Sequence, residues 1–225
     1  MVSLSGSRRV ITTVAKNPIA RVLAFAGVGY LALWLIGTVG TLSATAISRQ
    51  FEPSGETVSS IENFQKVDAH VWRGAAPAKE GYEELADRGF ATVVDLRTGV
   101  SEKQQALPKN EGLNLIRIPI RDGQTPTKEQ VTKFLQAVEK SDGPVFVHCG
   151  AGVGRTGSMS AAYLVRTGQA DARSAVVRML AIGPPSGEQI WYALNLTESS
   201  SVQPPKPVQA VSRIIDAPRR IMARF

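Results

Sequence analysis

The chain has 225 residues, 43% hydrophobic, 20% charged and 6% aromatic, which is enough for one ordinary domain plus an appendage but not for two full-sized domains. One cysteine excludes an intramolecular disulfide, and together with only two histidines it argues against a zinc cage of Cys and His ligands. The net charge of +7 lies in the ends of the chain, because residues 50–203 hold 16 basic and 18 acidic side chains. No basic stripe with interleaved aromatic residues is found, so we expect no nucleic-acid partner.

An apolar segment follows the N-terminus. Residues 22–48 carry no formal charge, and a helix that crosses a bilayer needs about 20 apolar residues, so this range predicts a single transmembrane helix. Four basic residues precede it: Arg8, Arg9, Lys16 and Arg21. Only Arg49 closely follows it. The positive-inside rule then predicts that residues 1–21 are cytoplasmic and that the rest of the chain lies on the extracytoplasmic side.

A cleaved signal peptide is the alternative interpretation of the same segment. Ala44-Thr45-Ala46 supplies an A-x-A cleavage site behind a basic N-terminal region, although the apolar stretch exceeds the usual 7–15 residues. Both interpretations stay open at this point. In either case residues 49–62 are expected to form a linker to a folded domain at residues 63–200.

The folded domain alternates strand and helix patterns. Short runs rich in β-branched residues predict four strands, at His70–Arg73, Ala91–Leu96, Leu115–Ile118 and Val145–His148. Helical periodicity and end signals predict five helices, over Lys79–Arg88, Lys128–Lys140, Thr156–Arg166, Ala172–Ile182 and Glu188–Leu196. Alternating strands and helices indicate an α/β fold in which a mostly parallel central sheet of four to five strands is flanked by helices.

A basic, proline-containing tail ends the chain at residues 201–225. Arginines alternate with apolar residues there, a pattern that an anionic membrane surface attracts. The arginines are Arg213, Arg219, Arg220 and Arg224. A solvated, disordered tail is an equally good interpretation, because four prolines interrupt the segment.

The richest pattern is the segment VFVHCGAGVGRTG at Val145–Gly157. It reads as an apolar strand, a glycine-rich loop and a helix that opens near Thr156. Such a junction directs successive backbone N–H groups and a helix N-terminus toward one point, which suits a phosphate. Cys149 opens the loop, and the amide donors, the helix N-terminus and Arg155 favour its thiolate form at neutral pH.

His148–Gly157, with the sequence HCGAGVGRTG, resembles the signature loop H-C-x5-R-[S/T] of the cysteine-dependent protein tyrosine and dual-specificity phosphatases. The resemblance covers roughly Val67–Leu196. Val71–Pro77 and Thr92–Arg97 resemble the first strands of the compact bacterial dual-specificity type. Neither the apolar segment nor the tail is included in it.

The resemblance implies a role for each residue of the loop. Cys149 would attack phosphorus and form a phosphocysteine. Arg155 would bind two phosphate oxygens, while Thr156 would donate its hydroxyl to the sulfur in the second step and His148 would orient the loop. Backbone N–H groups would bind the remaining oxygens, those of Gly150, Ala151, Gly152, Val153, Gly154 and Arg155. No metal and no cofactor is implied.

The leaving group also needs a proton, which a carboxylic acid elsewhere in the chain must supply. Asp122 is the first candidate, because its position resembles the general-acid loop of the family and it follows a strand expected to end beside the strand of Cys149. An ordinary Asp-Gly turn is its structural alternative. Asp95 is the second candidate, although beside Arg97 it is expected to fix local structure. Gln189 resembles a residue that positions the hydrolytic water.

Two other phosphate motifs are rejected. Gly152, Gly154 and Gly157 formally match a dinucleotide fingerprint, but the following run at Asp171–Ile182 is helical and supplies no acidic residue at the end of a second strand. The Walker pattern also fails, because no lysine follows the last glycine. A catalytically silent phosphate-binding or membrane-scaffold module stays open as an alternative function.

The side chains of the loop indicate the class of substrate. The variable positions, Gly150, Ala151, Val153 and Gly154, are all neutral, which favours a singly phosphorylated group such as phosphotyrosine in a phosphoprotein. The expected partners are therefore a phosphorylated protein and the lipid bilayer. A lipid phosphate monoester at the membrane is the main alternative substrate.

Overall fold

The computed structural model describes residues 17–218. The chain divides into two compact units, Met1–Gly40 and Thr41–Phe225, each of which is described by itself. Several basic residues on which the topology and tail predictions depend fall outside the described residues: Arg8, Arg9, Lys16, Arg219, Arg220 and Arg224.

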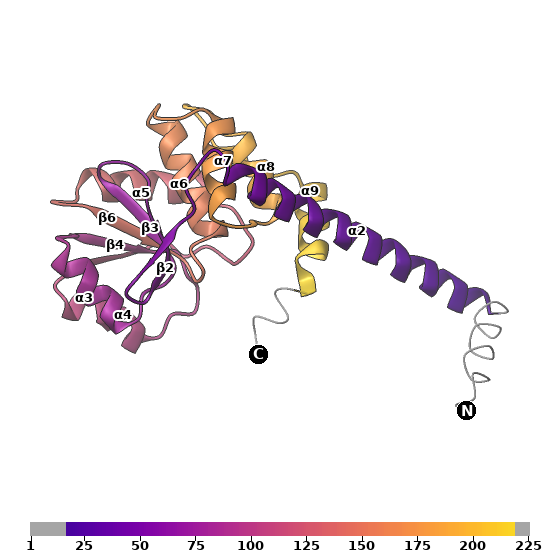
Figure 1. Cartoon of the computed structure of the whole chain (residues 1–225), viewed down its shortest axis with the longest axis horizontal. Helices are drawn as coiled ribbons and strands as arrows, with labels where there is room; N and C mark the ends of the chain where they lie inside the picture. The colour runs from indigo at the N-terminus through magenta and orange to yellow at the C-terminus, as the bar shows by residue number, and fades with distance from the viewer. Residues whose placement is uncertain (1–16, 219–225) are drawn as a thin grey trace. The chain divides into compact units, whose positions relative to one another are not determined.

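A six-stranded sheet in the order β1-β2-β3-β6-β4-β5 forms the centre of the larger unit (Figure 1). The strands are β1 (Glu56–Val58), β2 (Ile61–Lys66), β3 (Val71–Gly74), β4 (Thr92–Asp95), β5 (Asn114–Arg117) and β6 (Val145–His148). The four strands β3, β6, β4 and β5 pair in parallel, whereas β1 and β2 extend one edge antiparallel. The predicted α/β fold with a mostly parallel sheet is confirmed, with six strands rather than four to five.

Helices cover both faces of the sheet (Figure 1). A core cluster around Phe64, Tyr82, Leu85 and Phe146 packs beneath α3 (Lys79–Asp87) and α4 (Glu102–Asn110). The larger cluster, which includes Cys149, lies on the other face beneath four further helices. These are α5 (Lys128–Glu139), α6 (Gly154–Arg166), α7 (Ala172–Ile182) and α8 (Gly187–Leu194). The central strands β4 and β6 are buried along their whole length, as expected for the middle of a parallel sheet.

All four predicted strands and all five predicted helices of the domain are present, with ends that differ by at most two residues. Four elements were not predicted, namely β1, β2, α4 and α9 (Lys206–Ile215). β1 and the first residues of β2 fall within residues 49–62, which the sequence predicted as a linker. Part of that range is therefore a sheet edge.

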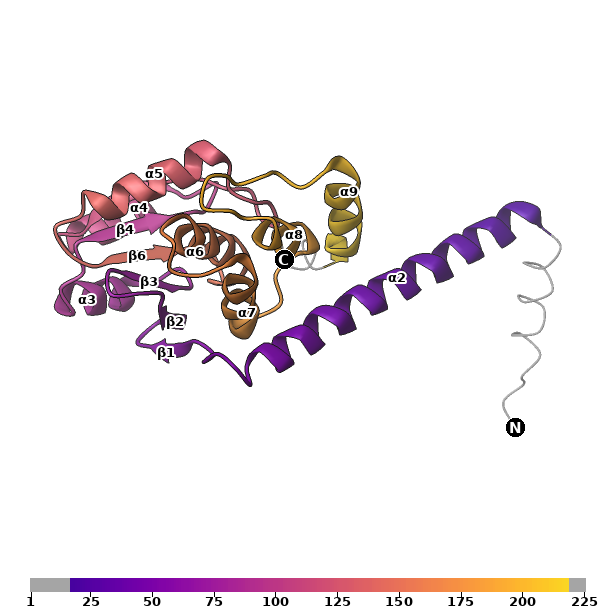
Figure 2. The ribbon, with the colours of Figure 1, turned by 90° about the horizontal axis from the view of Figure 1, so that it is seen from above.

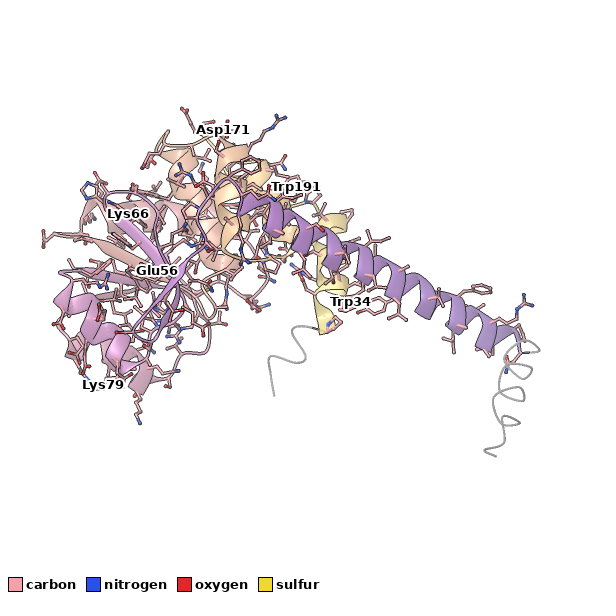
Figure 3. All side chains as sticks on the ribbon, in the orientation of Figure 1. Trp34, Glu56, Lys66, Lys79, Asp171 and Trp191 are labelled. Carbon is pink, nitrogen blue, oxygen red and sulfur yellow. The ribbon has the colours of Figure 1, made fainter. Side chains whose placement is uncertain are left out.

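The apolar segment forms one long helix, α2 (Pro18–Ser48). Its mean hydropathy of 2.0 and its 31 residues are sufficient to cross a membrane, and a signal sequence has the same features. Between residues 18 and 40 most of its large apolar side chains are exposed. Figure 3 shows the side chains of this helix, Trp34 among them, standing out around the ribbon.

The last residues of α2 belong to the larger unit, and they pack into it. Ala44 contacts the larger core cluster, and Thr45 and Ser48 are buried. Arg49, the next residue, donates from Nε to the carbonyl of Ala181 at 2.9 Å and from Nη2 to that of Ile182 at 3.1 Å. Because these carbonyls end α7, Arg49 caps that helix from a distant part of the chain.

The tail is helical over α9, which packs against α8 (Figure 2). Ser212 Oγ accepts a hydrogen bond from the backbone N–H of Glu188 at 3.0 Å. The buried carboxylate of Glu188 lies 3.4 Å from Arg213 Nε. The alternative of a disordered tail is therefore wrong for residues 206–215.

Candidate active site

Cys149 directly follows β6, at the carboxyl end of the parallel strands. Ligands of open parallel sheets bind at this edge, because helix N-termini and loops converge there. The thiol is buried, with 2% of the residue exposed. Residues 150–153 then form a tight loop that enters α6 at Gly154.

The carbonyl groups of this loop are held from outside. The N–H of Ala76 donates to the carbonyl of Gly150 at 2.8 Å, and Asn63 Nδ2 donates to that of Ala151 at 2.9 Å. Arg73 Nη2 donates to the carbonyls of Gly152 at 2.6 Å and Val153 at 3.2 Å.

These carbonyl contacts orient the N–H groups of the loop. In a planar trans peptide the N–H points opposite to the carbonyl of the same unit, so the amides of residues 151–154 point to the inner side of the loop. Within residues 17–218 no oxygen accepts a hydrogen bond from the N–H groups of residues 150–155. The loop therefore presents a set of free donors beside the thiol, which is an anion-binding arrangement.

Only glycine fits at position 152 of this loop. Its φ of +73° lies in the left-handed region, and a Cβ at this position would overlap the backbone of Gly74 and Ala75. This close approach brings the loop against the end of β3, where Arg73 reaches its carbonyls. At Gly154 a Cβ would instead overlap the side-chain amide of Gln189.

Arg155 and Asp122 are brought together although Arg155 lies in α6 and Asp122 lies in the loop between β5 and α5. Arg155 Nη2 lies 3.1 Å from Asp122 Oδ1, and Nη1 donates to the carbonyl of Ile120 at 3.3 Å. The expectation that β5 ends beside the strand of Cys149 is wrong, because β4 lies between β5 and β6. The long loop after β5 carries Asp122 back across the sheet edge to Arg155. The Asp122 side chain is 57% exposed and that of Arg155 only 11%.

His148 is fully buried, and its Nδ1 lies 3.1 Å from the carbonyl of Cys149. Burial lowers the pKa of His148 to about 4, outweighing the opposite effect of Asp95, whose Oδ1 is 4.0 Å away. The imidazole is therefore neutral at pH 7. A neutral ring that donates from Nδ1 to this carbonyl helps to fix the start of the loop.

Asp95, the second candidate for the acid, is buried and bonded to Arg97 through both oxygens, at 2.9 and 3.0 Å. Burial raises the pKa of Asp95, but its hydrogen bonds to Arg97 lower it, and the net pKa lies below the ordinary value. An ionised, paired carboxylate at this position fits the structural role that the sequence predicted for it.

Thr156 and Gln189 complete the predicted set. Thr156 is fully buried in the first turn of α6, and its hydroxyl has no hydrogen-bond partner within residues 17–218. Gln189 is buried at the start of α8, where its Oε1 accepts from the N–H of Ser186 at 3.0 Å. Its Nε2 donates to the carbonyl of Gln124 at 3.0 Å. Gln189 thus connects α8 to the loop that carries Asp122, beside Gly154.

Sequence reasoning missed Arg73 as part of the site. It lies in β3, only 2% exposed, and holds two carbonyls of the loop. Burial lowers the pKa of Arg73 to about 10, and attraction to Cys149 opposes that shift. The sequence of the Val71–Pro77 segment contained an indication of this role, because a charged residue, Arg73, stands there within a short strand that is expected to be buried.

The fold and this loop define a protein of the tyrosine and dual-specificity phosphatase class, with its Cys-x5-Arg motif between a central parallel strand and a helix. More narrowly, the chain belongs to the family described as a DSP-PTPase phosphatase fused to NAD+ kinase, whose model matches residues 45–192. That range includes the sheet, the loop, most of α8 and the last residues of α2.

Known proteins agree with this assignment. "NAD kinase 2, chloroplastic" of Arabidopsis thaliana is 34% identical over 113 residues, which are 47% of this chain and 11% of that protein. "Tyrosine-protein phosphatase CDC14" of Candida albicans is 31% identical over 128 residues, 53% of this chain and 23% of that protein. The chain thus spans a quarter or less of either relative. The crystal structure of Tk-PTP in its active form superimposes with a TM-score of 0.52 at 25% identity, over 64% of this chain and 99% of that one.

Proposed function

We propose that the chain hydrolyses phosphate monoesters through a phosphocysteine intermediate, with Cys149 as the nucleophile. One observation carries this proposal: the inward N–H groups of the loop converge beside the thiol where Arg155 and Asp122 also meet. The thiolate sulfur attacks phosphorus, and the bond from phosphorus to the leaving oxygen breaks. Asp122 gives its proton to that oxygen.

In the second step a water molecule attacks the phosphocysteine, and the Asp122 carboxylate accepts a proton from it. The bond between sulfur and phosphorus breaks, and inorganic phosphate and the thiolate are regenerated. Thr156 lies in the first turn of α6, and its hydroxyl stabilises the departing sulfur. Gln189 lies near enough to Gly154 to help orient the water, while its own bonds to Ser186 and Gln124 hold it in place.

Arg155 and the loop amides supply the charge stabilisation in this scheme. The guanidinium binds two equatorial oxygens, and the amides of residues 150–155 bind the rest, in a buried site where such bonds are strong. His148 and Arg73 position the loop from behind. No step requires a metal ion.

Among substrates, phosphotyrosine in a phosphoprotein is favoured. The neutral side chains at the variable loop positions fit a single phosphate group. The name of the Candida relative, a tyrosine-protein phosphatase, supports the same choice. A lipid phosphate monoester is the second candidate, because α2 is long and apolar enough to hold the enzyme at a bilayer.

The deciding experiment uses the full chain with p-nitrophenyl phosphate, in the presence of a chelator. We expect activity that vanadate blocks and that Cys149→Ser abolishes, and a phosphoenzyme that can be trapped with radiolabelled substrate. Activity that survives Cys149→Ser, or that disappears with the chelator, contradicts the mechanism. Complete inactivity of the folded chain supports the silent phosphate-binding module instead. Phosphotyrosine peptides and a phosphatidylinositol monophosphate, compared by kcat/KM, then separate the two substrate classes.

We also propose that α2 anchors the enzyme as a single-pass helix with a cytoplasmic N-terminus and an extracytoplasmic phosphatase domain. The support is the charge difference across α2 and its length. Protease added to spheroplasts should digest the domain. Full protection of the domain would place the active site in the cytoplasm.

A further inference from the structure

The loop that carries Asp122, residues 121–126, makes few backbone hydrogen bonds. Within the described part of the chain its one backbone–backbone bond, of 3.1 Å, closes a turn inside the loop itself. Asp122 is exposed, whereas Gly123, Thr125 and Pro126 are buried. The position of this loop therefore depends on packing and on side chains that reach it from other segments.

Two side chains at the start of α8 donate to carbonyls of the loop. Ser186 Oγ donates to the carbonyl of Gly123 at 2.9 Å. Gln189 Nε2 donates to that of Gln124 at 3.0 Å. Ser186 is only 1% exposed, and as the N-cap of α8 it also accepts from the N–H of Gln189 at 3.2 Å. One hydroxyl thus caps a helix and holds the residue next to Asp122.

Gln203, which lies beyond the range of the family match, binds the other end of the loop with both atoms of its amide. Its Oε1 accepts from Thr125 Oγ1 at 2.9 Å, and its Nε2 donates to the carbonyl of Pro126 at 2.7 Å. Gln203 is an exposed residue, so a substitution there removes these bonds and opens no cavity in the core.

A short hairpin turns the chain after α8 back toward the loop. Leu196 and Ser201 form an antiparallel bridge, and Thr197 and Ser200 exchange backbone hydrogen bonds of 3.0 and 3.3 Å. Leu196 belongs to the larger core cluster, which fixes the start of this turn. The segment between α8 and α9 then passes the start of α5, where Gln203 meets the loop (Figure 2).

We propose that Ser186 and Gln203 are positioning residues of the phosphatase reaction, which hold the loop so that Asp122 stays beside Arg155. This inference rests on the proposed function, in which Asp122 donates the proton. Ser186 binds the residue after Asp122, and Gln203 binds the end of the loop that leads into α5. A proton donor acts only within hydrogen-bond distance of the leaving oxygen, so a loosened loop slows proton transfer although the acid is still present.

Gln203→Met in the full chain, kept in detergent, keeps the length of the side chain and removes both bonds. For an alkyl phosphate kcat/KM should fall by about tenfold, and for p-nitrophenyl phosphate by less than about threefold, because a phenoxide needs the proton less. Gln136→Met, at an exposed position in α5, is the matched control and should change neither value. Unchanged kinetics, or equal losses on both substrates, would overturn the proposal.

Thr125→Val tests whether Gln203 acts through this hydroxyl. The substitution keeps the shape of the side chain and removes the donor. Alone it should lower kcat/KM for the alkyl phosphate, but in the Gln203→Met background it should have no further effect, because the bond is already lost. Additive losses in the double variant would contradict the proposal.

Ser186→Ala tests the first anchor against the loss of a helix cap alone. Ser101 forms the same kind of capping box at the start of α4, so Ser101→Ala is the control for lost helix stability. Only Ser186→Ala should lower kcat/KM for the alkyl phosphate more than for the aryl phosphate. The same ratio of the two values in both serine variants would contradict a positioning role for Ser186.

Trypsin measures the anchoring without catalysis. Arg121 is exposed next to Asp122, and cleavage between them needs a local opening of the loop. Mass spectrometry during brief digestion should show the fragment that begins at Asp122 several-fold earlier in Gln203→Met and Ser186→Ala than in the parent and control chains. Equal rates would overturn the proposal. An inactive parent chain would contradict the proposed function, and this test would still decide whether the two side chains hold the loop.

Discussion

The Arg155 guanidinium lies 3.1 Å from the Asp122 carboxylate, so the two side chains proposed to bind phosphate and to donate the proton are bonded to one another. A phosphate dianion that enters the loop competes with Asp122 for this guanidinium. Binding of substrate would then release the carboxylate from Arg155 and leave it free to act on the leaving oxygen.

Asp122→Asn tests this exchange through the leaving group. Because an alkoxide needs a proton more than a phenoxide does, kcat/KM for an alkyl phosphate should fall by about 10²–10⁴ and that for an aryl phosphate by less. The basic limb of the pH profile should flatten as well. Asp87→Asn, at an exposed position at the end of α3, is the control and should change neither. Equal losses on both substrates would assign the acid to another residue, with Asp95 the next to examine.

Arg73→Met tests whether β3 positions the loop. The variant loses the charged donor to Gly152 and Val153, and such bonds contribute about 1.5–3 kcal/mol, so kcat/KM should fall roughly tenfold to a hundredfold. The affinity for vanadate should fall in parallel, because the loop amides lose their orientation. Arg173→Met, on the surface of α7, should leave both values unchanged. Unaltered vanadate affinity in Arg73→Met would show that the loop holds its shape without this residue.

Gly152→Ala should be more damaging than its backbone angle alone predicts. A residue with a Cβ costs about 1–2 kcal/mol in the left-handed region, and here the Cβ would also overlap Gly74. Gly168→Ala is a matched control, because Gly168 has a similar φ of +69° but open space around it. Urea unfolding should show a moderate loss for Gly168→Ala with full activity, and a larger loss with little activity for Gly152→Ala. Similar behaviour of the two variants would show that the contact with β3 is unimportant.

His148 predicts a loss of stability in mild acid. In the unfolded chain its pKa is near 6.5, whereas in the folded chain burial lowers it to about 4. As the pH falls between these values only the unfolded chain takes up the proton, so the free energy of unfolding should decrease by roughly 3 kcal/mol. Above pH 6.5 this contribution is fully present.

Urea titrations at several pH values measure this effect. In His148→Asn the decrease between pH 6.5 and 4 should be smaller by about that amount. His70→Asn, at the exposed histidine, is the comparison and should retain the slope of the parent chain. Equal slopes in all three chains would contradict a neutral buried His148.

The parts of the site that lie close together in sequence were the ones that could be predicted. β6, the loop and the start of α6 form one run of residues, so the Cys-x5-Arg spacing was sufficient to predict that Cys149 and Arg155 lie at the same loop. Asp122 was placed by resemblance. Its route to Arg155 was not predictable, because strand order depends on packing of the whole sheet, and β4 separates its strand from β6.

Contacts that join distant segments were missed for the same reason. Asn63 and Arg73 hold the loop from about 80 residues away, and nothing in the local pattern of β2 and β3 identifies their partners. α4 was missed because it is polar and contains Pro108. Its start was nevertheless readable, since Ser101 and Gln104 form a capping box.

The packing of the end of α2 limits where the chain can be shortened. Cleavage after Ala46, as in a secreted protein, would remove Ala44 and Thr45 from the core of the phosphatase domain, and the family match already begins at Thr45. A truncated chain that starts at Ile47 should therefore melt at a lower temperature than one that starts at Thr41. The last two turns of α2 thus serve as the first helix of the folded domain, and no chain that lacks them keeps that edge of the fold intact.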